Sequence, residues 1–147
     1  MDKGAAVALA AVVGGVVVVQ GPLNSQLARS VGGIEAAAIA LTVSATSMIA
    51  LSLVTGGSGG VRNIGDAPLH VIIGGGLAGA VFIASLVWTI RALGVGGVTA
   101  VTIAGQLGIA VVIDHYGWLG VEKSPITAAK VFGLVLLAVG TWLVIRE

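Results

Sequence analysis

The stretch from Gly4 to Ala28 reads GAAVALAAVVGGVVVVQGPLNSQLA and holds no charged residue in 25 positions. The hydrocarbon core of a bilayer is about 30 Å thick, and a helix needs about 20 consecutive apolar residues to cross it. Four further stretches, 36–61, 67–90, 92–113 and 124–145, are of similar length and carry no charge except at Lys130. Each stretch can cross a bilayer once but not twice. The sequence therefore predicts five transmembrane helices, at about 4–28, 34–55, 68–90, 94–113 and 124–145.

The composition excludes several other classes of protein. Hydrophobic residues make up 57% of the 147 residues, and only 13 side chains are charged, 7 Lys+Arg and 6 Asp+Glu, whereas a soluble domain has about a quarter charged residues. A net charge of +1 offers no electrostatic footprint for nucleic acid. Because the chain has no cysteine, disulfides, thiolate metal sites and thiol catalysis are excluded. We expect a protein of the lipid bilayer that is not an enzyme and has no cofactor, metal site or nucleic-acid partner.

The apolar stretches are typical of helices and not of strands. Val16–Val19 and Leu134–Leu137 are continuously apolar, whereas strands of a membrane barrel alternate apolar and polar residues. The first apolar run continues to Gln20 and is longer than the 7–15 residues, roughly, of a signal peptide, so we expect this helix to be retained. The connections are too short for an extramembrane domain. The chain is predicted to be an all-α polytopic membrane protein with a single five-helix domain over residues 1–147.

The basic residues leave the orientation of the chain almost undecided. Lys and Arg are enriched on the cytoplasmic side of a membrane. If side A is the side of the N-terminus, it receives four basic residues and side B three: Lys3, Arg62, Lys123 and Lys130 against Arg29, Arg91 and Arg146. Two interpretations stay open: a single orientation with side A in the cytoplasm, or dual topology, in which two oppositely inserted copies pair as an antiparallel dimer. Since five is odd, such a dimer is a ten-helix inverted repeat, a common plan of secondary transporters.

Small residues at helical spacing favour close packing between helices. Gly75 and Gly79 form a GxxxG pattern, and Gly133 and Gly140 lie seven residues apart on one face of the last helix. Helices in lipid approach each other most closely where their side chains are small. These glycines can serve contacts within one chain or the contact between two chains.

Amide side chains are the polar groups deepest in the predicted spans. Gln20 and Asn24 lie four residues apart on one helical face, and Pro22, which removes a backbone hydrogen bond, lies between them. Gln106 lies near the middle of 94–113. Interrupted helices point to binding sites in transporters, so Gln20, Asn24 and Gln106 are candidates for lining a solute pathway. The alternative is that these amides bond to one another or to a neighbouring helix.

A second group of polar residues lies at the predicted membrane edge. Asp114 and His115 follow the fourth helix, and Lys130 lies in the early turns of the fifth. Because a helix C-terminus disfavours a negative charge, an ion pair between Asp114 and Lys130 would stabilise both charges. The alternative is a gate or proton relay formed by Asp114 and His115.

Several short motifs occur in one order along the chain. They are GGLAGA at 75–80, LG at 93–94, AGQL at 104–107 and IDHYGWLG at 113–120. Together with Gln20, Asn24 and Leu27, and with Lys130 and Gly133, they resemble the YdcZ-type family, small five-helix members of the drug/metabolite transporter superfamily. The second helix departs from the family pattern at 44–48, where a Ser-Phe pair followed by glycine is expected.

The resemblance implies a small-solute secondary transporter of the bacterial inner membrane that works by alternating access. Its partner would be a second copy of the chain in inverted orientation, or a related paired subunit, and the two chains together would equal one ten-helix transporter. The main alternative is a non-transporting membrane subunit that assembles with or stabilises a larger complex. Only a transporter requires Gln20, Asn24 and Gln106 to face water.

Overall fold

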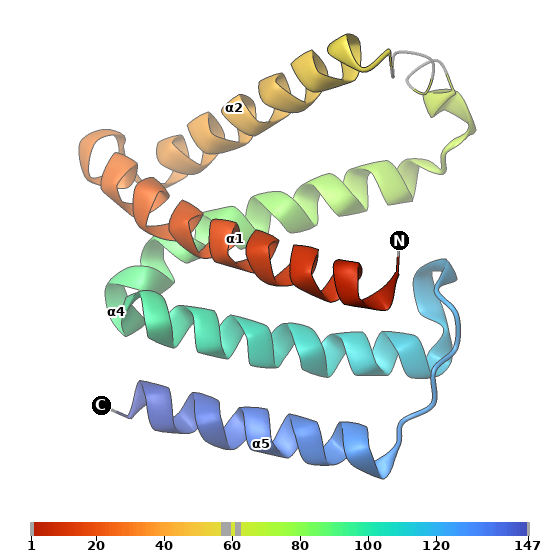
Figure 1. The fold of residues 1–147 in the computed structure, drawn as a ribbon. Helices are drawn as coiled ribbons and strands as arrows, with labels where there is room; N and C mark the ends of the chain where they lie inside the picture. Colours follow the sequence, from red (N-terminus) through yellow and green to blue (C-terminus); the bar gives the residue numbers. More distant parts are fainter. Residues whose placement is uncertain (1, 57–59, 61–62, 147) are drawn as a thin grey trace. The chain divides into compact units, whose positions relative to one another are not determined.

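A computed structural model of the protein describes residues 2–56, 60 and 63–146. These residues form helices and connecting turns, with no strand among them. Arg62, which enters the charge count of side A, lies outside the described residues. Four of the described helices are long and apolar enough to cross a membrane (Figure 1): α1 (Lys3–Val31), α2 (Gly33–Val54), α4 (Leu69–Tyr116) and α5 (Ala128–Ile145). Two short 3-10 turns, η1 (Ile64–Asp66) and η2 (Trp118–Gly120), lie in the connections.

Side-chain caps fix where two of the helices begin. The Asp2 carboxylate precedes α1 and accepts a hydrogen bond of 2.7 Å from the backbone N–H of Ala5. The Thr127 hydroxyl precedes α5 and accepts one of 3.3 Å from the backbone N–H of Lys130. Such caps satisfy backbone donors that the first turn of a helix leaves free.

Among the described residues, four long apolar helices are observed where five segments were predicted. Segments 4–28, 34–55 and 124–145 correspond to α1, α2 and α5 within a few residues, whereas 68–90 and 94–113 both lie in α4. This helix has 48 residues and is interrupted at Gly94, where φ is 68° and ψ is 173°, values outside the helical region.

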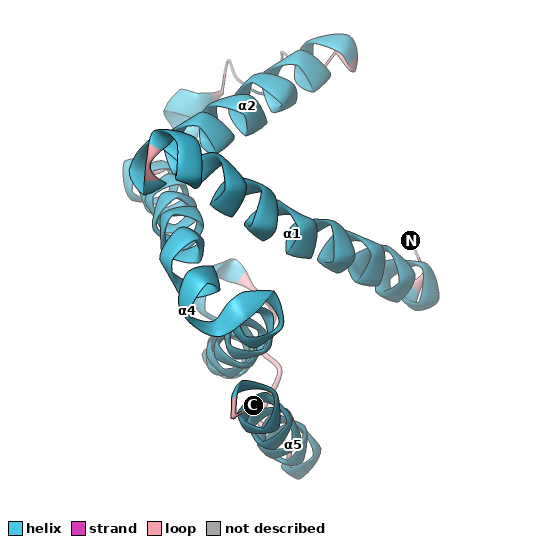
Figure 2. Cartoon of the chain, turned by 90° about the vertical axis from the view of Figure 1, so that its left-hand side faces the viewer, coloured by secondary structure: helices cyan, strands magenta, loops and turns pink. Residues whose placement is uncertain are grey.

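Residues 1–91 and 92–147 form two compact units. In the first unit, α1 ends at Val31 and α2 begins at Gly33, so Gly32 alone joins them. The two helices diverge from this connection (Figures 1 and 2). Gly32 has φ 97° and ψ 159°, a region that essentially only glycine occupies. Its N–H donates to the carbonyl of Ala28 at 3.1 Å. One glycine thus makes the whole connection between two apolar helices.

The core of the first unit lies beside this turn. It consists of Ala28 on α1, Ala36 on α2 and Val87 on α4, with Leu27 packed against them. Val87 is the largest side chain of the described residues that is fully buried. A Cβ added at Gly33 would lie only 3.4 Å from Val87 Cγ1. Val87 is therefore closely packed because its neighbours on α1 and α2 are small.

In the second unit, α5 packs along the part of α4 that follows Gly94. The Thr141 hydroxyl on α5 donates to the carbonyl of Ala100 at 3.2 Å. A Cβ added at Gly97 would lie 3.6 Å from Ile145 Cγ2. Most other large apolar side chains of both units are exposed, as expected of helices that lipid surrounds.

Candidate functional site

The polar turn predicted in α1 belongs to the buried face of that helix. Its four buried residues are Gly21, Asn24, Ser25 and Ala28, spaced by three and four residues as on one side of a helix. Pro22 lies inside α1, where it can donate no hydrogen bond to the carbonyl four residues earlier. Polar groups and a missing backbone bond therefore occur within two turns of an apolar helix.

This buried face of α1 lies against α2 and α4 within the first unit. Ala28 contacts the cluster formed with Ala36 and Val87. A Cβ added at Gly21 would lie 2.6 Å from Ile90 Cδ1, so the missing side chain lets α1 and α4 approach closely. We call the packed face of Gly21, Asn24, Ser25 and Ala28 with Val87 and Ile90 the α1–α4 seam.

The two amides of α1 have different surroundings. Asn24 is only 7% exposed, and its Nδ2 is the one buried side-chain nitrogen or oxygen of the described residues that has no hydrogen-bond partner. Gln20, one turn earlier, is half-buried. The structure thus places Asn24 inside the seam and Gln20 at the margin of the buried face.

The third amide, Gln106, belongs to the second unit. It is exposed on the part of α4 between Gly94 and Tyr116. Its accessibility is compatible with the predicted pathway, and its relation to Gln20 and Asn24 stays a prediction.

The predicted edge residues form a network through Ser124. The Lys130 ammonium donates to the Ser124 carbonyl at 3.1 Å and to its hydroxyl at 2.7 Å. The Ser124 N–H in turn donates to the backbone carbonyl of Asp114 at 2.8 Å. In this part of the described chain, therefore, Lys130 bonds to Ser124, and its link to Asp114 runs through the main chain and involves no carboxylate contact.

His115 also helps to hold the connection between α4 and α5. Its Nδ1 accepts a 3.3 Å hydrogen bond from the backbone N–H of Ile126. The next ring, Tyr116, stacks on Trp118 with centroids 5.0 Å apart. These contacts give His115 a structural role in the connection, and its part in a gate or proton relay with Asp114 stays a prediction.

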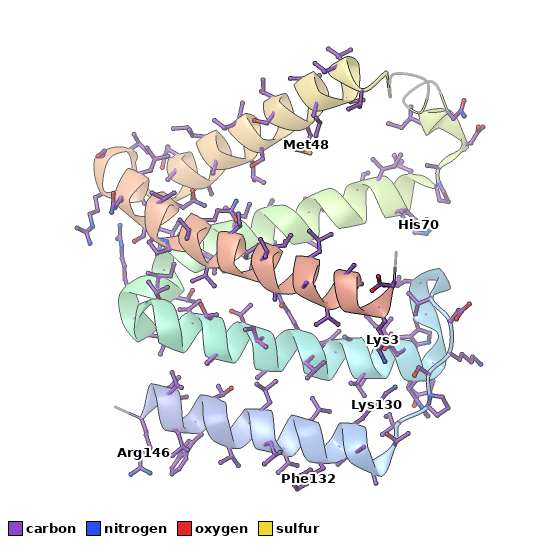
Figure 3. The ribbon with its side chains drawn as sticks, in the orientation of Figure 1. Lys3, Met48, His70, Lys130, Phe132 and Arg146 are labelled. Carbon is purple, nitrogen blue, oxygen red and sulfur yellow. The ribbon has the colours of Figure 1, made fainter. Side chains whose placement is uncertain are left out.

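The two ends of α5 carry basic side chains (Figure 3). Lys130 lies at the end next to the connection from α4, and Arg146 lies at the opposite end. The Arg146 guanidinium lies 4.5 Å from the centroid of the Trp142 ring. A cation stacked on an amphipathic ring is typical of the membrane–water interface, so α5 has interfacial anchors at both ends.

The four glycines predicted to pack helices have open space around them. A Cβ added at any of them would meet no atom of the chain within 4 Å: Gly75, Gly79, Gly133 and Gly140. Their close packing against another helix is therefore not part of the described fold of either unit.

The sequence pattern did not single out two polar residues of these sites. Ser25 is buried in the seam, and its position four residues after Gly21 on the same face was the available signal. Ser124 joins Asp114 to Lys130, and its place directly before Pro125 is typical of an ordered turn. No group of three or more metal-ligating side chains occurs among the residues that the structure describes.

Comparison with known proteins finds one family. The model of the family described as "Putative inner membrane exporter, YdcZ" matches residues 5–143. No curated protein and no solved structure matches the chain. The family match covers nearly the whole sequence and includes every candidate residue above.

Proposed function

Because the chain belongs to the YdcZ family, we propose that it is a small-solute secondary transporter of the drug/metabolite transporter type, acting as an antiparallel dimer by alternating access. The protein is a multi-pass protein of the inner membrane. The observation that carries the proposal is the polar turn of α1, in which Gln20 and Asn24 flank Pro22 directly after the apolar run 4–19. Polar side chains beside a break in the backbone hydrogen bonds of a membrane helix are a feature of transporter binding sites.

The proposal treats α4 as two membrane-crossing helices, 69–93 and 95–116. A straight helix of 48 residues would be about 72 Å long, more than twice the bilayer core of about 30 Å. The two parts, of 25 and 22 residues, would be about 37 and 33 Å long. Gly94 also shares the backbone region of Gly32, the residue that joins α1 to α2. These features support five spans.

Five spans place the two ends of one chain on opposite sides of the membrane. An inverted second copy, or a related paired subunit, would then complete a ten-helix inverted repeat. The helical spacing of Gly75 with Gly79 and of Gly133 with Gly140 supports such a partner, because close helix contacts in lipid use small residues.

In such a dimer, amide side chains of the two copies lie at similar depths in the membrane. Gln20 lies beyond the middle of the first span toward side B, and Gln106 lies on the side A half of the fourth. Inverting one chain exchanges the two halves, so Gln20 of one copy and Gln106 of the other reach nearly the same level. Together with Asn24, they would line one polar pathway.

Cysteine labelling tests this pathway, because the natural chain has no cysteine. Gln20→Cys and Gln106→Cys are expected to react with a small water-soluble thiol reagent in membrane vesicles. Val12→Cys and Val101→Cys are matched controls on the same helices, at side chains 66% and 40% exposed that should face lipid and stay unreactive. If the variants at 20 and 106 react no faster than these controls, the chain is better described as a non-transporting subunit.

A further inference from the structure

The seam between α1 and α4 contains a buried donor that lacks an acceptor. The Asn24 side chain is 7% exposed and its Nδ2 has no hydrogen-bond partner. Hydroxyl groups elsewhere in the first unit behave differently, because those of Thr42, Thr46 and Ser85 each donate to the carbonyl four residues earlier. Asn24 thus differs from these hydroxyls, because its buried donor finds no acceptor on its own helix or on a neighbouring one.

This arrangement disfavours the packed form of the seam. Burying an amide donor without an acceptor costs free energy, and the bilayer core has no water to supply an acceptor. The other residues of the seam are Gly21, Ala28, Val87 and Ile90, which have no polar side chain, and Ser25, whose hydroxyl forms no hydrogen bond with Asn24 Nδ2. The closed seam therefore provides tight apolar packing but leaves Asn24 unsatisfied.

The backbone beside Asn24 allows the seam to separate. Pro22 removes one hydrogen bond from α1 two residues before Asn24, and Gly32 ends the helix eight residues after it. The segment 23–31 therefore lies between a weakened turn of helix and a one-residue connection. It can change its tilt without breaking the regular hydrogen bonds of α2 or of α4.

We propose that the α1–α4 seam is a closed gate of the transport pathway, and that Asn24 favours its opening because water then supplies the acceptor that the closed form lacks. This inference rests on the proposed transport function and adds to it the element that moves. Segment 23–31 is the part that moves, and Asn24 shifts the equilibrium between the closed and the open form of the gate. A solute that passes the open gate meets an amide donor at this point.

Ser25→Cys measures the opening directly. Ser25 is buried in the seam, and the substitution replaces only oxygen by sulfur. In purified protein in lipid vesicles, with no solute added, a water-soluble maleimide is expected to label the thiol at position 25 measurably, whereas the lipid-facing control Val12→Cys stays unlabelled. Complete protection of position 25 means that the seam is permanent packing, and it overturns the proposal.

Asn24→Leu tests the cause of the opening. Leucine has a similar size and needs no acceptor, so the closed seam becomes more favourable. In the Ser25→Cys background this change is expected to slow labelling by about tenfold and to raise the thermal unfolding midpoint in detergent. Unchanged labelling, or a lower midpoint, would mean that Asn24 has a partner in the closed form, and either result overturns the proposal.

The outcome is separable from that of the proposed function. If Gln20→Cys and Gln106→Cys react while Ser25→Cys does not, the pathway stands and the gate lies elsewhere. If none of the three reacts, the transport function itself fails.

Discussion

Replacing Gly94 by alanine tests whether the interruption of α4 is encoded by that residue. At φ 68° and ψ 173°, a residue with a Cβ is destabilised by about 1–3 kcal/mol. An added Cβ would meet no atom of the chain within 4 Å, so a steric clash contributes nothing. Alanine also favours a continuous helix over glycine by about 1 kcal/mol. The balance between bent and straight α4 should shift by about 2–4 kcal/mol, which is about 30- to 700-fold.

Gly96→Ala is the matched control. Gly96 lies two residues further along α4, an added Cβ there also meets no atom within 4 Å, and its φ lies outside the left-handed range. We expect Gly96→Ala to be neutral or slightly stabilising, whereas Gly94→Ala lowers the thermal unfolding midpoint in detergent and the yield of folded protein. If the two variants are equally stable, the conformation at Gly94 does not require glycine, and the argument for two spans in α4 loses its main support.

Two further predictions concern the edge network and the orientation. Lys130→Met should destabilise the protein by about 1–2 kcal/mol, because it removes charge-assisted hydrogen bonds to Ser124. In double-mutant cycles of thermal stability, its effect should couple to that of Ser124→Ala and be additive with that of Asp114→Asn. Coupling to Asp114→Asn alone would contradict the network. Lys3→Ala with Arg62→Ala leaves side A with two basic residues against three, so a C-terminal reporter in cells should shift toward the opposite side; a reporter that stays wholly on one side before and after the change would exclude dual topology set by charge.

Helix positions could be predicted from the sequence because bilayer thickness fixes the length of an apolar span. The predicted segments 4–28 and 34–55 differ from α1 and α2 by at most three residues at any end. The connection between them was harder to foresee. Whether Gly32 or Gly94 adopts a positive φ depends on the packing of the flanking helices, which the local sequence does not contain.

The candidate site was predictable in its members and less so in its contacts. Gln20, Asn24 and Gln106 stand out by residue type among apolar neighbours, but the unequal burial of Asn24 and Gln20 depends on which face of α1 packs on Val87 and Ile90. Likewise, charge alone favoured Asp114 as the partner of Lys130. The segment after η2 brings Ser124 to Lys130, and its hydroxyl and carbonyl satisfy the ammonium without a carboxylate.

The packing of the first unit bears on the proposed role of Asn24 in a gate. A membrane helix gains little from burying apolar side chains, because lipid tails solvate them as well as protein does. The seam is therefore held by close contacts of small residues such as Gly21 and Ala28. The free-energy cost of the unsatisfied donor at Asn24 is of the same order as the gain from such contacts. The closed and open forms of the proposed gate can therefore be close in free energy. A larger apolar residue at position 24 would favour the closed form, because it has no side-chain donor that gains a hydrogen bond to water when the seam opens.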